Sequence, residues 1–180
     1  MLTTESACPR RRSSIIPSIL LAAFVCLFSL SPTLSAATGD RPNIIIIYTD
    51  DQGFGDASCL NSNSAFQTPN LDRLAKEGLV FTNAHSPDTV CTPSRYGLLT
   101  GRYCWRTVKK TGVLLAEGPC LIEDDRMTIA SLLSDQGYDT AMVGKWHLGM
   151  QFPGEPGARD WSKPVTDMPL DKGFDYFYGV

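Results

Sequence analysis

Residues 90–101 read VCTPSRYGLLTG, the pattern of a loop that runs into a short helix. Thr92 is a typical N-cap residue and Pro93 suits the first helical position, which predicts a helix over residues 94–100. Gly101 fits the position just past the helix, where the backbone often turns left-handed. The stretch therefore predicts a sharply bounded helix.

The expected start of this helix bears on Cys91 and Arg95. The first backbone N–H groups of a helix have no partner within it, so they favour an anion nearby. Arg95 lies one turn along, on the side that can lean back over Cys91. This pattern indicates a candidate reactive thiol. For a cysteine taken alone, a small buried residue beside a capped helix is the favoured interpretation.

An acidic pair follows the apolar sequence NIIIIY at residues 43–48. An unbroken β-branched run predicts a strand buried on both faces, and ligands of α/β proteins bind where such strands end. Asp50 and Asp51 come at that end, with glycines after them, and carboxylate oxygens suit Ca²⁺ or Mg²⁺. A turn or a helix cap would explain the same residues, and we interpret the nearby Asp56 as structural.

A third cluster is GKWHLG at residues 144–149, directly after a predicted strand. In an extended segment, residues two apart point the same way. Lys145 and His147 would then present a cation and an imidazole on one side, with Trp146 on the other. A strand-edge lysine and an internally bonded histidine are the simpler alternative.

The three clusters together, in this order, resemble the signatures of the sulfatase family, and the resemblance extends over about residues 41–180. In the family, the cysteine of the Cys-x-Pro-Ser-Arg pattern is oxidised to the aldehyde Cα-formylglycine. A formylglycine-generating or sulfatase-maturing enzyme performs this oxidation. The resemblance implies this modification for Cys91, whose new oxygen would also be a metal ligand.

The resemblance also implies roles for the residues around that cysteine. Asp50 and Asp51 match the ligands of a divalent cation, usually Ca²⁺, with Mg²⁺ possible in its place. Arg95 and Lys145 match cations that stabilise the hydrated aldehyde and the sulfate oxygens. His147 matches the histidine that contacts a hydroxyl of the modified residue or the sulfate.

The implied activity is hydrolysis of sulfate monoesters of aryl or carbohydrate type. In the family, one hydroxyl of the hydrated aldehyde attacks sulfur and displaces the alcohol, and the other then expels sulfate. Alternatives are a phosphonate or phosphate ester hydrolase of the same superfamily, and a non-catalytic exported fragment. Family members are much longer, so we expect an N-terminal part with an incomplete site and little activity of its own.

Residues 1–37 read as a signal peptide. Three arginines at positions 10–12 precede an apolar core at 15–30 and a small-residue cleavage region. The core is short for a membrane span, so cleavage is favoured over a retained anchor. We expect residues 38–180 to be exported to a periplasm, a lumen or the exterior, with no stable membrane span. The net charge of −3 gives no reason to expect nucleic-acid binding.

Export brings the remaining cysteines into oxidising surroundings. Besides Cys91, these are Cys59, Cys104 and Cys120, an odd number. A bridge between Cys104 and Cys120 and no bridge at all are both compatible with the sequence.

The overall pattern is α/β, since predicted strands alternate with predicted helices. The strands are expected at 43–48, 79–82 and 139–143, and the helices at 70–77, 94–100 and 127–136. Residues 151–169 are expected to form a loop, and residues 172–179 a strand whose aromatic side chains pack in the core. The resemblance implies a truncated alkaline-phosphatase-like sandwich with a mainly parallel sheet.

Overall fold

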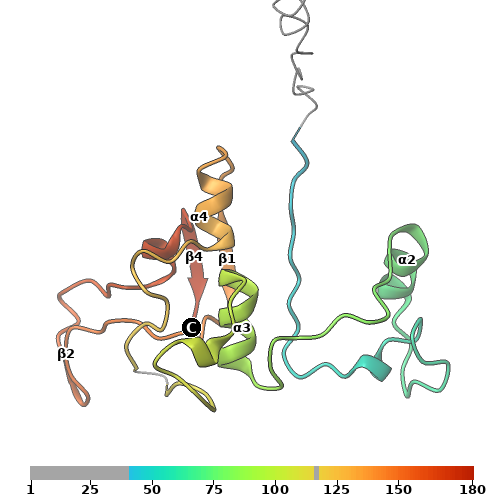
Figure 1. Ribbon diagram of the computed structural model, residues 1–180, viewed down its shortest axis with the longest axis horizontal. Coiled ribbons are helices and arrows are strands. Elements are labelled where there is room, and N and C mark those ends of the chain that lie inside the picture. The colour runs from blue at the N-terminus through green and yellow to red at the C-terminus, as the bar shows by residue number, and fades with distance from the viewer. Residues whose placement is uncertain (1–40, 116–117) are drawn as a thin grey trace, which may run out of the picture. The chain divides into compact units, whose positions relative to one another are not determined.

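The computed structural model describes residues 41–115 and 118–180 (Figure 1). The predicted signal peptide lies outside these residues. The chain divides into two units after Ile47, and the second unit, from Tyr48 to Val180, contains every helix and strand of the described residues. In the described ranges, no helix is both long and apolar enough to cross a bilayer.

The second unit contains short helices and strands connected by long loops. In chain order they are η1 (Phe54–Asp56), α2 (Pro69–Glu77), α3 (Cys91–Thr100), η2 (Cys104–Arg106), α4 (Ile129–Ser134), β1 (Ala141–Gly144), β2 (Gly154–Glu155), β3 (Ala158–Arg159), η3 (Pro169–Lys172) and β4 (Tyr176–Gly179).

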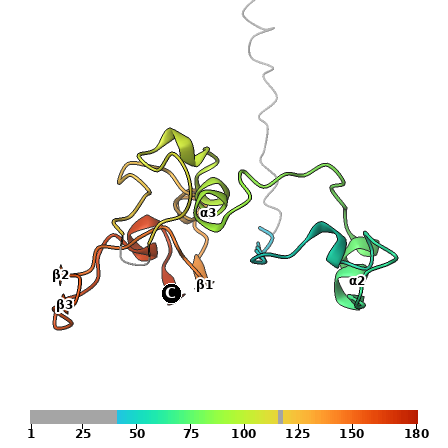
Figure 2. The same ribbon diagram turned by 90° about the horizontal axis from the view of Figure 1, so that it is seen from below.

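A parallel pair of strands confirms the predicted α/β class. β1 pairs with β4 in register from Ala141 opposite Tyr176 to Gly144 opposite Gly179, and the two lie side by side in Figure 1. The strand predicted at 139–143 is therefore confirmed, with a start two residues later. The expected loop at 151–169 contains a small antiparallel hairpin of β2 and β3 (Figure 2).

The helices at 70–77 and 127–136 are confirmed as α2 and a shorter α4. Pro69 is the first residue of α2, and the Gly78 N–H bonds to the Leu74 carbonyl at its end. At α4, the Thr128 hydroxyl accepts from the Ser131 N–H, and the Ser131 hydroxyl accepts from the Thr128 N–H. These reciprocal bonds satisfy donors that the helix itself cannot.

The predicted start of α3 is wrong by three residues. Val90 is the N-cap, and Cys91 is the first helical residue. The Thr92 hydroxyl does not cap the helix because it bonds to the His147 carbonyl and the Leu114 N–H instead. The predicted end is confirmed, since Gly101 is left-handed at φ 63°.

Two predicted strands are wrong. Residues 43–48 and 79–82 form no strand, and their side chains are largely exposed, with Ile45 at 84% and Leu79 at 78%. A strand needs a partner for its backbone N–H and C=O groups. Neither segment has a strand partner among the residues that the structure describes. An apolar run alone therefore did not produce a strand.

A small core supports α3 and the segment after β1. It consists of buried Tyr96, Cys104, Leu121, Ile122, Trp146 and Leu148. The aromatic residues of β4 differ in burial. Phe177 packs on this core, while Tyr176 and Tyr178 are 55% and 70% exposed. The expectation that all these aromatics are core residues is therefore wrong for the two tyrosines.

The four described cysteines are free thiols, so the structure contains no bridge between Cys104 and Cys120. Burial raises the pKa of the Cys104 thiol above its ordinary value. Burial also raises the pKa of Cys120 to about 11. Both groups are therefore protonated thiols at neutral pH.

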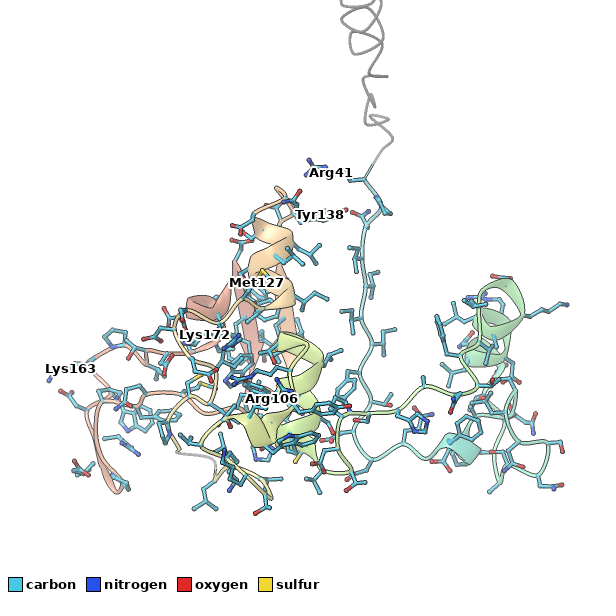
Figure 3. All side chains as sticks on the ribbon, in the orientation of Figure 1. Arg41, Arg106, Met127, Tyr138, Lys163 and Lys172 are labelled. Atoms are coloured by element: carbon cyan, nitrogen blue, oxygen red, sulfur yellow. The ribbon has the colours of Figure 1, made fainter. Side chains whose placement is uncertain are left out.

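Two ion pairs of a buried lysine fix the end of η3. Lys172, labelled in Figure 3, has a side chain only 3% exposed, and its Nζ lies 2.6 Å from Asp167 and 3.0 Å from Asp124. Burial opposes its charge, but the bonds to Asp167 and Asp124 outweigh this and raise the pKa of Lys172. The Thr128 hydroxyl also donates to the Lys172 carbonyl, which joins η3 to the start of α4.

The glycine after η3 gives a test of this packing. Gly173 has φ 100°, and a Cβ there would collide with the backbone of Ser131 in α4. Gly112 has φ 72° and open space around it, so it is a matched control. We expect Gly112→Ala to cost about 1–2 kcal/mol through its backbone conformation. Gly173→Ala should cost at least about 2 kcal/mol more through overpacking. Denaturant unfolding measures both, and equal costs would contradict this packing.

Candidate functional site

Helix α3 presents Cys91 at its first turn, where it is half-buried with a free thiol. The Ser94 N–H bonds to the Val90 carbonyl at 3.2 Å and closes this turn. The Ser94 hydroxyl donates to the Asp88 carbonyl at 2.7 Å, which ties the preceding loop to the helix. Cys91 is thus held by a fixed backbone and lies among the free N–H groups of the helix start.

Arg95 links α3 to two other segments. Its side chain is 10% exposed, and its Nη1 donates to the Lys145 carbonyl. Nη2 lies 3.6 Å from Asp50 Oδ2, and the guanidinium lies 5.6 Å from the centre of the Tyr48 ring. Its buried Nε has no hydrogen-bond partner within the described residues.

Lys145 and Asp50 form the closest ion pair of the site. Lys145 Nζ donates to Asp50 Oδ2 at 2.6 Å. This bond is the largest cause that lowers the pKa of Asp50, and the charges of Arg95 and His147 lower it further. The same bond raises the pKa of Lys145, and the negative charge of a Cys91 thiolate contributes to the rise.

The backbone of the GKWHLG segment is not extended, so the predicted alternation is wrong. His147 has φ 52°, a left-handed conformation that turns the chain at this residue. Trp146 is buried, and its Nε1 donates to the Gly149 carbonyl. Lys145 nevertheless reaches Asp50, while His147 Nε2 lies 3.0 Å from the Leu114 carbonyl oxygen.

Asp51 is exposed, with φ 58°, and makes no described contact with the other predicted residues. Asp50 and Asp51 fit a hard cation in donor type, but they supply few of the six to eight oxygens that Ca²⁺ prefers. Within the described residues, no group of three or more acidic, histidine or cysteine side chains could hold a metal ion. Asp56 instead accepts from the Gly53 N–H, which fits the structural role expected for it.

The structure thus brings Asp50, Arg95 and Lys145 into direct contact and leaves Asp51 apart. Two cations against one carboxylate leave a positive excess that favours a bound anion. Sequence reasoning missed the two partners of His147, Thr92 and Leu114. Thr92 looked like a helix cap, and Leu114 acts through its backbone, which no side-chain pattern reveals.

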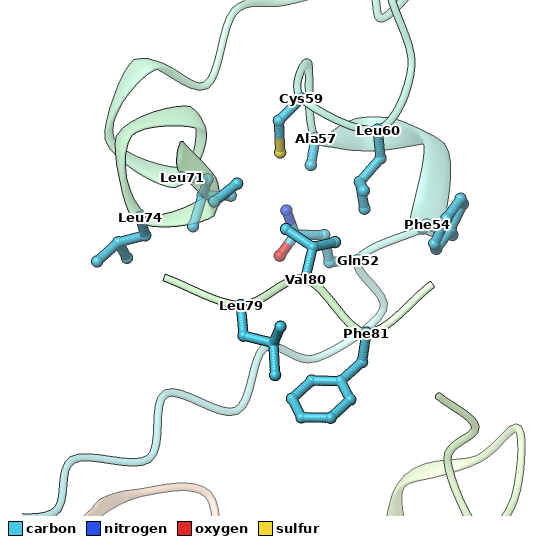
Figure 4. Close-up of a pocket in the computed structure, with 12 residues that line it drawn as sticks. Gln52, Phe54, Ala57, Cys59, Leu60, Leu71, Leu74, Leu79, Val80 and Phe81 are labelled. Carbon is cyan, nitrogen blue, oxygen red and sulfur yellow. The ribbon is translucent and has the colours of Figure 1, made fainter. Parts of the chain in front are cut away.

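An apolar pocket of about 420 Å³ lies elsewhere in the second unit (Figure 4). Leu71 and Leu74 of α2 form one wall, and residues 79–81 form another. None of the predicted catalytic or metal-binding residues lines it.

Comparisons with known proteins bear on the identity of this site. The Sulfatase family model matches residues 42–180. An N-acetylgalactosamine-6-O-sulfatase of Bacteroides thetaiotaomicron is 43% identical over 140 residues, which cover 78% of this chain and 26% of that protein. The steryl-sulfatase of Homo sapiens is 42% identical over 165 residues, which cover 87% of this chain and 26% of that protein.

Solved structures give a similar result. A structure from work on the metabolism of multiple glycosaminoglycans by Bacteroides thetaiotaomicron matches with a TM-score of 0.69 and 40% identity. The match covers 79% of this chain and 28% of that one. The chain therefore spans about a quarter of the length of the relatives it matches.

The Asp50–Lys145 pair predicts that the stability of the fold depends on pH in the acid range. The pKa of Asp50 lies below its ordinary value of 3.8, so its ionised form stabilises the fold above that value. This contribution is lost as the pH falls through the lowered pKa. Lys145→Met should raise the pKa of Asp50 toward the ordinary value, as measured by carboxyl ¹³C NMR during an acid titration.

Lys163→Met is the matched control, because Lys163 pairs with Asp160 at 3.2 Å and not with Asp50. It should leave the titration of Asp50 unchanged. An Asp50 midpoint that is the same in all three proteins would mean that Lys145 does not hold this carboxylate in solution.

Proposed function

Because the chain belongs to the sulfatase family, we propose that it carries the nucleophile and the anion-binding cations of a site that hydrolyses sulfate monoesters. The observation that carries this proposal is the placement of Cys91 at the start of α3, one turn before Arg95, whose Nη1 donates to the Lys145 carbonyl. The family match and the structural likeness agree with the resemblance in the three motifs and with the expected alkaline-phosphatase-like fold.

The proposed nucleophile is the side chain of residue 91 after maturation. A maturing enzyme, which also supplies the oxidant, would convert the CH₂SH group of Cys91 to the aldehyde of Cα-formylglycine. Once hydrated, that side chain supplies one hydroxyl that displaces the alcohol from sulfur and a second whose collapse to the aldehyde releases sulfate. The half-buried position of Cys91 suits this role, since a substrate must reach it while bulk water is limited.

Arg95 and Lys145 would bind the sulfate oxygens. Arg95 is nearly buried and fixed by the Lys145 carbonyl and by Asp50, so its charge is preorganised. The Lys145 side chain is 38% exposed, so its Nζ can reach an incoming anion. His147 would accept a proton from a hydroxyl of the modified residue.

Asp50, Asp51 and the oxidised side chain of Cys91 would hold a divalent cation, Ca²⁺ or in its place Mg²⁺. When bound, such an ion would favour the ionised form of a nearby hydroxyl at neutral pH. Asp50 already accepts a hydrogen bond from Lys145, so a cation bound to Asp50 would reduce the negative charge available to Lys145.

We propose a carbohydrate or aryl sulfate as the substrate. One relative is named as an N-acetylgalactosamine-6-O-sulfatase, which supports the carbohydrate class, and another as a steryl-sulfatase, so the group that carries the sulfate differs among similar proteins. We also propose that residues 1–37 direct export, which would place residues 38–180 in a periplasm, a lumen or the exterior. A preference of the matured protein for phosphate or phosphonate esters over sulfate esters would favour the alternative hydrolase.

Mass spectrometry tests the modification directly. The full chain is expressed in a host that matures sulfatases, and the peptide containing Cys91 is analysed. Its mass should fall by the difference between CH₂SH and CHO. Cys59, an exposed free thiol in the same chain, is the internal control and should keep its thiol. An unmodified Cys91 in such a host would contradict the proposal.

Calcium binding tests the proposed ligands. Added Ca²⁺ should raise the melting temperature of the matured chain, since a ligand at 100 times its Kd stabilises by about 2.7 kcal/mol. Asp51→Asn should abolish this shift. Asp56→Asn should retain it, because Asp56 bonds to the Gly53 N–H. A shift that survives Asp51→Asn would remove Asp51 from the site.

A further inference from the structure

Three hydrogen bonds form a closed ring around His147. The Thr92 hydroxyl donates to the His147 carbonyl at 3.1 Å and accepts from the Leu114 N–H at 3.1 Å. The Leu114 carbonyl in turn lies 3.0 Å from His147 Nε2. The ring therefore joins α3, the loop after η2 and the segment after β1.

This ring of hydrogen bonds determines which nitrogen of the His147 imidazole carries the proton. A backbone carbonyl can only accept a hydrogen bond, so His147 Nε2 must donate an N–H to Leu114. In the neutral imidazole the lone pair is then on Nδ1. Nδ1 is buried and has no hydrogen-bond partner within the described residues. Nδ1 is therefore the one nitrogen of the His147 imidazole that can accept a proton.

The surroundings leave Thr92 little freedom to exchange these bonds for water. Thr92 has an exposed fraction of 0%, and the neighbours of His147, Trp146 and Leu148, are 1% and 0% exposed. Removing the hydroxyl would leave the half-buried Leu114 N–H and His147 carbonyl without this partner. A partly buried polar group that loses its partner is costly unless it finds another, so the peptide of residue 114 would be expected to move.

We propose that Thr92 is a positioning residue that, through the Leu114 peptide, holds His147 in the Nε2–H tautomer and leaves Nδ1 as the proton acceptor of the site. One part of the inference rests on the proposed function: the proton that Nδ1 accepts would come from a hydroxyl of the modified residue 91. The orientation itself belongs to the unmodified chain. Residue 92 thus acts on the imidazole while its neighbour carries the nucleophile.

The chain has only two histidines, so NMR of the full chain with ¹⁵N-labelled histidine can test the proposal. Spectra are recorded about two pH units above the ordinary histidine pKa of ~6.5, where a free imidazole is neutral. The wild-type His147 should show a single Nε2–H tautomer. Thr92→Val has the shape of threonine without the hydroxyl and should show loss of that single form. Thr92→Ser keeps the hydroxyl and should restore it.

His85 is the internal control, because its Nε2 lies 2.8 Å from Asn83 Oδ1 and no bond to Thr92 is involved, so its tautomer should be the same in all three proteins. A folded Thr92→Val protein that keeps the wild-type tautomer would overturn the role of Thr92. A wild-type ring protonated on Nδ1 would overturn the proposal whether or not the variant folds. Neither result depends on oxidation of Cys91, so failure here differs from failure of the proposed function.

Discussion

The site depends on the guanidinium of Arg95, which joins α3 to the segment after β1 and to the residues before η1. One nitrogen donates to the Lys145 carbonyl, another faces Asp50, and the cation lies near the Tyr48 ring. Only a planar group with several fixed donors can serve these partners together, and a lysine ammonium would have to abandon some of them. Because the side chain is nearly buried, these contacts also offset the cost of removing its charge from water. The position of Cys91 relative to Lys145 follows from this link.

The same link sets the electrostatics. Asp50 carries the single negative charge between Arg95 and Lys145, and both cations contribute to its lowered pKa. Its Oδ2 lies 2.6 Å from Lys145 Nζ and 3.6 Å from Arg95 Nη2, so a metal ion at Asp50 would compete with both side chains for the same negative charge. Any ion that took Asp50 would therefore leave Lys145 with less compensation and a stronger attraction for an anion. Binding of a cation by Asp50 and binding of sulfate by Lys145 would therefore be coupled.

Local sequence predicted where the helices lie, and it predicted those helix ends that nearby residues define. Pro69, Gly78 and Gly101 each act within one turn of the helix end they define. The strands at 43–48 and 79–82 failed because strand formation needs a partner that composition cannot specify. The site residues Asp50, Arg95 and Lys145 were predicted from motifs and do meet in space. Asp51 was predicted in the same way, but no described contact brings it to them.

Thr92 shows why the remaining part of the site was not visible in the sequence. Its local propensity favours capping, and a residue before a helical proline is an ordinary place for a cap. In the structure, a partner 55 positions away and another 22 positions away take the hydroxyl instead. The helix starts one turn earlier than expected, with Val90 as its N-cap, and Cys91 is its first residue rather than a loop residue. A long-range pair of hydrogen bonds to residue 92 thus anchors the first turn of α3, on which the nucleophile of residue 91 would be built.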